Sequence, residues 1–276
     1  ADAAAGVARE DSTLWRVTLP GGRGVVHYRV RIQPAPASPR RAWMPFARAD
    51  GAMINSPDFF LYVVEFPNTP VTLDIDVPSR WHVATALPSR GSAMQRAAPD
   101  ATTLLDSPIM LGALRTWSFA ERGADWHVVY WPLPGATPFD TASFVDQIHR
   151  LTVAALDVFG HAPSTDYSFL IQDDATDALE HRASVTIGVP SERLARDPRA
   201  SMLELTHEFF HSWNLVAVRP AQYNDLSHRP PRRTPLLWLG EGVTLYYAEL
   251  LPRRAHLAAP DPTRLEHLGA LLERYY

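Results

Sequence analysis

The sequence predicts an α+β protein in which a β-rich N-terminal domain, residues 1–109, precedes a domain of helices and strands, residues 110–276. Three observations predict this class. Short runs that alternate apolar and polar side chains fill the first 109 residues, separated by turns rich in proline and glycine. Thr141–Phe159 has apolar residues at helical spacing. Ser201–Asn214 is also helical in pattern, mostly apolar, and carries two histidines one turn apart.

The composition is that of an ordinary globular protein, with 46% hydrophobic and 20% charged residues among 276. The formal net charge of −4 gives no reason to expect a nucleic-acid partner. The chain has no cysteine, which excludes disulfides, zinc–thiolate sites and thiol catalysis and leaves both the bacterial periplasm and the cytoplasm open as locations. No apolar run in the sequence reaches the length of a membrane span.

In the N-terminal domain we expect a frayed terminus over residues 1–12 and then a hairpin around the glycines at positions 21, 22 and 24. The strands of this hairpin would be Leu14–Leu19 and Val25–Ile32. Further strands are expected at Phe59–Phe66, Val71–Val77 and Trp81–Leu87, followed by a polar linker over 88–103. Together these strands predict a β-sandwich-like domain.

In the second domain, Asp140 is expected to cap the helix Thr141–Phe159 and Gly160 to end it. Strands are expected on both sides of this helix, at Trp117–Phe119, Trp126–Trp131, Tyr167–Ile171 and Ser184–Val189. Four prolines predict a loop over residues 215–235. A helix around Glu241 and a last helix opened by Asp261 and Pro262 would follow.

The segment Ser201–Asn214 contains His207, Glu208 and His211 in the spacing His-Glu-x-x-His. On a helix the two imidazoles would lie on one face and could bind one zinc ion. Glu208, beside the first imidazole, could act as a general base on a metal-bound water. The alternative is a pair of hydrogen-bonded core histidines.

Two further features are expected of this helix. Ser201 and Glu204 predict a capping box that starts it near Met202. Its apolar side chains are expected to be buried: Leu203, Leu205, Phe209, Phe210 and Trp213. Asn214 is expected to cap its C-terminal end.

A catalytic zinc needs a third protein ligand and an open coordination position. Glu241 lies early in the second apolar, helix-like stretch and is the candidate; the alternative is a structural salt bridge. Thr244, almost one turn later, could hydrogen-bond a ligand histidine or its own backbone. Tyr246 and Tyr247 are expected to lie in the core or the wall of the cleft.

Three segments carry a family resemblance. His207–Asn214 reads His-Glu-Phe-Phe-His-Ser-Trp-Asn and is followed by Arg219-Pro220, while Trp238–Tyr247 reads Trp-Leu-Gly-Glu-Gly-Val-Thr-Leu-Tyr-Tyr. Upstream stands Leu179-Glu180-His181-Arg182-Ala183-Ser184. In this order the segments resemble the glycyl aminopeptidases, peptidase family M61, which belong to the gluzincins together with thermolysin and aminopeptidase N. The resemblance covers roughly residues 177–250.

The resemblance implies the first lobe of a thermolysin-like zinc peptidase domain behind the β-rich domain. It also implies one Zn²⁺ held by His207, His211 and Glu241, with Glu208 as general base for a zinc-bound water that hydrolyses peptide bonds. In related aminopeptidases a glutamate at the sheet edge binds the substrate's free α-amine, and Glu180 matches that position; the alternative is an ordinary exposed glutamate. We expect Ser184–Val189 to be this edge strand.

This sequence departs from the family pattern at the two residues that precede Leu179. The family usually has two glycines where this chain has Asp177 and Ala178, so the added side chains could narrow the cleft or change the path of the strand. The family also usually has more strands at the start and a helical lobe, often with a PDZ-like module, after the position of Tyr276. We therefore expect a longer parent chain and weak or no activity for these residues alone.

Two alternatives remain open at this point. The first is a non-catalytic zinc-binding module that binds peptides and lacks the oxyanion-stabilising lobe. The second concerns the oxyanion donor, which the sequence does not identify. Among the remaining histidines only His228, in the loop between the ligands, is a candidate for the site.

Overall fold

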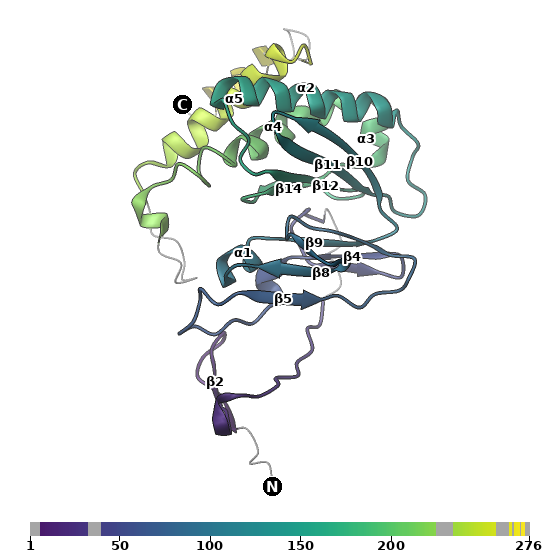
Figure 1. Ribbon diagram of the computed structural model, residues 1–276. Helices are drawn as coiled ribbons and strands as arrows, with labels where there is room; N and C mark the ends of the chain where they lie inside the picture. The colour runs from purple at the N-terminus through teal and green to yellow at the C-terminus, as the bar shows by residue number, and fades with distance from the viewer. Residues whose placement is uncertain are drawn as a thin grey trace. The chain divides into compact units, whose positions relative to one another are not determined.

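The computed structural model describes residues 6–32, 40–224 and 234–257, together with 265–266, 268–270 and 272–273 (Figure 1). The chain divides into two compact units, Ala1–Arg31 and Ile32–Tyr276. The α+β class is confirmed. Within the described residues, no helix has the length and apolar character that crossing a membrane requires.

The first unit contains an antiparallel hairpin of β1 (Gly6–Arg9) and β2 (Trp15–Thr18). The predicted hairpin is wrong in its pairing, because β2 pairs with residues that were expected to be a frayed terminus. The Asp11 carboxylate accepts hydrogen bonds from the amides of Thr13 and Leu14 and so closes a local turn. Val25–Ile32, all of it described, forms no strand, although Gly21 and Gly22 do make the expected turn with φ of 74° and 70°.

The second unit begins with two small antiparallel sheets. One has the order β3–β4–β9–β6, with β3 at Phe46–Arg48, β4 at Gly51–Ile54, β9 at Ile109–Gly112 and β6 at His82–Ala84. The other has the order β5–β8–β7, with β5 at Val71–Asp74, β8 at Ser92–Ala98 and β7 at Ser89–Arg90. Side chains from both, including Ala52, Leu111 and Leu73, share one apolar cluster. This is the predicted sandwich-like arrangement.

Two N-terminal predictions are wrong. Phe59–Phe66 is not a strand but a loop after the 3-10 turn Ser56–Asp58. Alternation alone misled because most of its apolar side chains stay exposed, although Phe60 is partly buried against the core. The expected linker over 88–103 instead contains β7, β8 and the helix α1 (Ala101–Leu105). Asp100 starts α1 by accepting a hydrogen bond from the Thr103 amide.

A five-stranded sheet with the order β10–β11–β12–β14–β13 forms the centre of the unit. Its strands are β10 at Arg115–Glu121, β11 at Ala124–Trp131, β12 at Asp166–Gln172, β13 at Ala178–Glu180 and β14 at Ser184–Gly188. Strands β11, β12 and β14 are parallel to one another, whereas β10 and β13 are antiparallel at the two edges. The predicted edge strand is therefore wrong: β14 lies inside the sheet and β13, which carries Glu180, forms the edge.

Helix α2 (Thr141–Phe159) connects β11 to β12, and its predicted boundaries are confirmed. The Asp140 carboxylate accepts from the Ser143 amide, and Gly160 ends the helix in the left-handed conformation. Figure 1 shows α2 and α4 over one face of the five-stranded sheet, where their apolar side chains join its main core.

The two faces of this sheet follow from the alternation of side chains along each strand. On β11, Trp126 and Val128 point into the main core beneath the helices, whereas Val129 and Trp131 pack with Met53 of the N-terminal sheet. Gly51 is required at this contact, because a Cβ there would come within 2.5 Å of the Trp131 ring. The central strands are thus buried on both faces.

The remaining helices follow β14: α3 (Ser191–Arg196), the 3-10 turn Pro198–Ser201, α4 (Met202–His211), the 3-10 turn Ala221–Asn224, the π-helical turn Trp238–Gly242 and α5 (Val243–Arg254). Helix α4 starts at Met202 as predicted, but not through a capping box, because the Ser201 hydroxyl donates to the Pro198 carbonyl instead. Leu203 is 37% exposed, contrary to prediction, while the other four side chains that were expected to be buried are buried: Leu205, Phe209, Phe210 and Trp213.

Two predictions fall partly or wholly on residues that are not described. Most of the loop predicted over 215–235 is described and contains one 3-10 turn, but residues 225–233, including His228, lie outside the described part. Of the last predicted helix, positions 265–266, 268–270 and 272–273 are helical. The boundary at 109/110 stays a prediction.

Candidate metal centre

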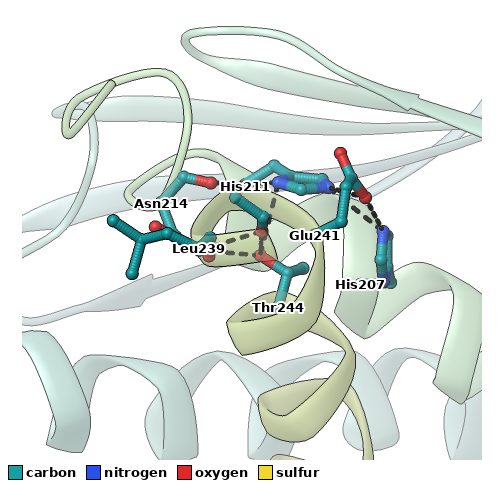
Figure 2. Close-up of polar contacts among 7 residues, drawn as sticks. His207, His211, Asn214, Leu239, Glu241 and Thr244 are labelled. Atoms are coloured by element: carbon teal, nitrogen blue, oxygen red, sulfur yellow. Dashed lines mark hydrogen bonds and ion pairs between the residues drawn. The ribbon is translucent and has the colours of Figure 1, made fainter. Parts of the chain in front are cut away.

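Helix α4 presents its two histidines on one face because they are four residues apart. Its opposite face is held by aromatic packing, since the buried Phe209 ring lies 5.3 Å from Tyr167 and 5.1 Å from both Phe169 and Trp213, measured between centroids. These contacts fix the rotation of α4 against the sheet. His207 and His211 therefore point away from the core, toward the segment that carries Glu241 (Figure 2).

The donor atoms of His207, His211 and Glu241 converge at one point. The two Nε2 atoms are 3.1 Å apart, and they lie 3.3 Å and 3.6 Å from Oε2 of Glu241. Zinc–ligand bonds of about 2.0–2.1 Å in a tetrahedron place neighbouring ligand atoms about 3.3–3.4 Å apart. The three atoms therefore have the spacing of one face of a zinc tetrahedron, and a fourth position remains for water or substrate.

The tautomer of His211 suits this role. Its Nδ1 lies 2.9 Å from the backbone carbonyl of Asn214, which can only accept a hydrogen bond. Nδ1 therefore carries a proton, and Nε2, which faces His207 and Glu241, is the nitrogen that can bind a metal. A ligand histidine that donates its other N–H to a carbonyl is the usual arrangement at protein metal sites.

Glu241 lies on the π-helical turn Trp238–Gly242, directly before α5. Such turns are rare and occur often at functional sites. The Thr244 hydroxyl donates to the Gly240 carbonyl at 2.6 Å and lies 3.4 Å from Nδ1 of His211, so both interactions considered from the sequence are present. The turn that carries Glu241 and the imidazole of His211 thus share one hydrogen-bonded residue, Thr244.

The prediction that Asn214 caps α4 is wrong, because the C-cap residue is Ser212. The side-chain amide of Asn214 lies 3.0 Å from the carbonyls of Leu239 and Gly240 and from the hydroxyl of Thr244. This role was not predicted, because it depends on the position of a turn that lies far along the sequence. The only signal was its place in the motif, three residues after His211.

The electrostatics of the three convergent groups are strongly coupled. Hydrogen bonds from His207 and His211 hold the pKa of Glu241 well below its usual range. Burial lowers the pKa of His211, but the hydrogen bonds to Glu241 and Asn214 outweigh it and raise the pKa to about 9. The three groups together therefore favour a positive charge between them, as a set of metal ligands must.

Glu208, one residue after His207, lies beside Glu180 of the edge strand β13. Burial and the neighbouring charge of Glu180, which is also in hydrogen-bond contact, raise the pKa of Glu208 to about 8. Two carboxylates at such a short separation can share one proton, because both cannot be ionised without a cation between them. The structure therefore places Glu180 and Glu208 together, next to the histidine pair.

The departure from the family's two glycines is accommodated in the backbone. Asp177 has φ of 61°, a conformation that glycine adopts freely and that aspartate tolerates better than most residues. Ala178 is buried in β13 and pairs with Ile187 of β14. This chain thus forms β13 and reaches Glu180 without glycine at these two positions.

The two tyrosines after Thr244 differ in their surroundings. Tyr247 stacks on Phe210 at 4.6 Å between ring centroids, in agreement with the expected core or wall role. Tyr246 is 63% exposed, so it does not lie in the core. No oxyanion donor can be assigned among the described residues from the contacts of these two side chains.

Comparisons with known proteins place this chain in a family. Residues 2–113 match the model of the Peptidase M61 N-terminal domain, and residues 201–276 match that of the M61 glycyl aminopeptidases. The comparison with curated proteins found no similar sequence. The two family matches lie in order along the chain and together span most of it.

Solved structures share the fold. An aminopeptidase N family protein from Idiomarina loihiensis has a TM-score of 0.71 and 23% identity, over 76% of this chain and 38% of its own. An M1 zinc metallopeptidase from Deinococcus radiodurans has a TM-score of 0.50 and 18% identity, over 87% of this chain and 54% of its own. This chain thus spans about half or less of the length of these relatives. By its two family matches, the chain belongs to peptidase family M61.

Proposed function

We propose that this chain carries the catalytic site of a zinc-dependent aminopeptidase. The observation that supports it best is the convergence of His207, His211 and Glu241 at tetrahedral spacing, with two carboxylates beside them. Family membership and the fold shared with M1 zinc metallopeptidases support the same class.

In this proposal Glu208 is the general base. A Zn²⁺ held by the three ligands would polarise the scissile carbonyl and lower the pKa of a water molecule. Glu208 takes the proton from the attacking water and passes it to the leaving amine. Its pKa, raised to about 8 by burial and by Glu180, makes it a stronger base than an ordinary glutamate.

Glu180 binds the free α-amine of the substrate. A substrate ammonium would bring the positive charge that allows Glu180 and Glu208 to be ionised at the same time. The ammonium also sets the register of the peptide, because the edge strand that carries Glu180 lies against α4. The first peptide bond would then lie over the metal, which gives an exopeptidase.

The Glu208→Gln variant tests this proposal. The amide keeps the shape of the side chain and leaves the three ligands in place, so one Zn²⁺ per chain should remain bound. In a chain long enough to be active, turnover of an aminoacyl p-nitroanilide should fall by about 10²–10⁴-fold, because the amide cannot accept the proton. The matched control is Glu192→Gln, an exposed position on α3, which should leave the rate unchanged.

Two outcomes contradict the assignment. A Glu208→Gln rate within tenfold of the original would move the general base to another residue. A zinc-loaded full-length protein that binds peptides but cleaves none of them would instead favour the non-catalytic peptide-binding module.

A further inference from the structure

Asn214 lies between the two elements that carry the metal ligands. Its carbonyl accepts the Nδ1 proton of His211 on α4 at 2.9 Å. Its side-chain amide reaches across to the turn before α5, at 3.0 Å from the carbonyls of both Leu239 and Gly240. Figure 2 shows Asn214 and Thr244 next to His211, with Glu241 on the far side of the imidazole.

The hydrogen bonds define the orientation of the Asn214 amide. Its three neighbours are two carbonyls and the Thr244 oxygen, whose proton is already donated to the Gly240 carbonyl at 2.6 Å. All three can only accept, so the NH₂ group of Asn214 must face them. Nδ1–H of His211 can likewise be shared between the Asn214 carbonyl and the Thr244 oxygen, at 2.9 and 3.4 Å.

The turn that carries Glu241 needs such partners. In a π-helical turn the backbone bonds run from i to i+5, so carbonyls lose the partners that an α-helix would give them. Gly240 is buried in this turn, and an unpaired buried carbonyl is costly. Asn214 and Thr244 satisfy the carbonyls directly before Glu241 and so hold the ligand turn in place.

The backbone at Asn214 is itself held in a strained loop. The next residue, Leu215, has φ of 137°, which is unusual for a side chain that is not glycine. The amides of Val216 and Val218 bond to the carbonyls of His211 and Trp213 and keep the loop closed. These hydrogen bonds thus hold the strained loop in the conformation that directs the Asn214 carbonyl toward His211.

We propose that Asn214 is a positioning residue that couples His211 to Glu241 and so sets the geometry and affinity of the metal centre. Thr244 is its partner in this role. Asn214 acts on the ligands and has no contact with the substrate in this assignment. The proposal rests on the proposed zinc site, and its test reads metal binding rather than turnover.

The test measures the Zn²⁺ dissociation constant by competition with a chromophoric chelator. Asn214→Ala keeps the carbonyl to His211 but removes the amide, and Thr244→Val keeps the shape but removes the hydroxyl. Each should weaken zinc binding by about 10–100-fold, the usual effect of losing such a support. Thr244→Ser should restore affinity, and the exposed control Asn68→Ala should not change it.

Two further readings separate positioning from general destabilisation. The d–d absorption of the Co²⁺-loaded protein should change in Asn214→Ala, because the imidazole and carboxylate lose their mutual alignment. The combined loss in Asn214→Ala/Thr244→Val should be smaller than the product of the single losses, because both act on the same turn. A cavity of about 160 Å³ borders Asn214, so water can reach the exposed carbonyls and the variant should fold.

An Asn214→Ala protein with zinc affinity within twofold of the original and an unchanged Co²⁺ spectrum would overturn the proposal. If that variant does not fold, the zinc affinities of Thr244→Val and Thr244→Ser decide. Equal affinities of these two variants would overturn the proposal. A wild-type chain that binds no zinc would instead overturn the proposed metal centre, which is a separate result.

Discussion

The Glu180→Gln substitution is the sharpest test of exopeptidase specificity. Glu180 ends the edge strand β13, where its carboxylate is in hydrogen-bond contact with that of Glu208. Glutamine keeps the length of the side chain but removes the charge that an ammonium requires. A hydrogen bond to a charged group contributes about 1.5–3 kcal/mol, which corresponds to about 10- to 150-fold in rate.

The assay compares kcat/KM for an aminoacyl p-nitroanilide with a free amine and for its N-acetylated form. The original protein should prefer the free amine, and Glu180→Gln should lose about 10- to 150-fold on that substrate alone. The acetylated substrate carries no ammonium, so its kcat/KM should change little. Glu192→Gln is again the matched control, because it removes a charge on α3 outside the site.

Two results would refute this reasoning. If Glu180→Gln lowered kcat/KM equally for both substrates, the residue would act on catalysis and not on the amine. If the original protein cleaved both substrates equally well, there would be no amine anchor to remove, and the protein would be an endopeptidase.

The remaining predictions concern stability. Phe209→Ala should lower the free energy of unfolding by about 3–5 kcal/mol in urea denaturation, because the ring is fully buried. Leu203→Ala on the same helix should lower it far less, because Leu203 is partly exposed. Similar losses for the two variants would contradict the packing described for α4. In the metal-free protein, Glu208 and His211 have pKa values raised to about 8 and 9, so the native state holds protons that the unfolded chain releases, and the melting temperature should fall between pH 6.5 and 8. Glu208→Gln should fall less steeply over this interval, and identical slopes would show that Glu208 does not titrate there.

Local signals allowed the helices to be predicted well. Asp140 and Gly160 bound α2 at the predicted residues, because a cap and a left-handed glycine act within one turn of the chain. The start of α4 was predicted for the wrong reason, since the Ser201 hydroxyl is engaged by the preceding Pro198 turn. Capping patterns thus predict where a helix starts better than which atoms cap it.

Strand pairing depended on longer-range contacts that the sequence pattern does not contain. Val25–Ile32 alternates as a strand should, but a turn at Asp11 allows β2 to pair with β1 instead. For Ser184–Gly188, complete burial distinguishes an interior strand from an edge strand, and that burial comes from β12, β13 and the helices. The pattern alone predicted the strand but not its position within the sheet.

The convergent residues of the site could be named from the sequence because helical spacing brings His207 and His211 together. The part played by Asn214 could not, since its carbonyl is common to every residue and its amide partners lie on the Glu241 turn. Sequence patterns identify side chains that bind directly more readily than the residues that orient them.

Metal analysis tests the central claim most directly. The purified chain, supplemented with zinc and freed of excess metal, should contain one Zn²⁺ by elemental analysis. Crystals measured at the zinc absorption edge should show a single anomalous peak within about 2.0–2.2 Å of Nε2 of His207, Nε2 of His211 and the Glu241 carboxylate. A chain without transition metal after supplementation, or an anomalous peak elsewhere, would contradict the account.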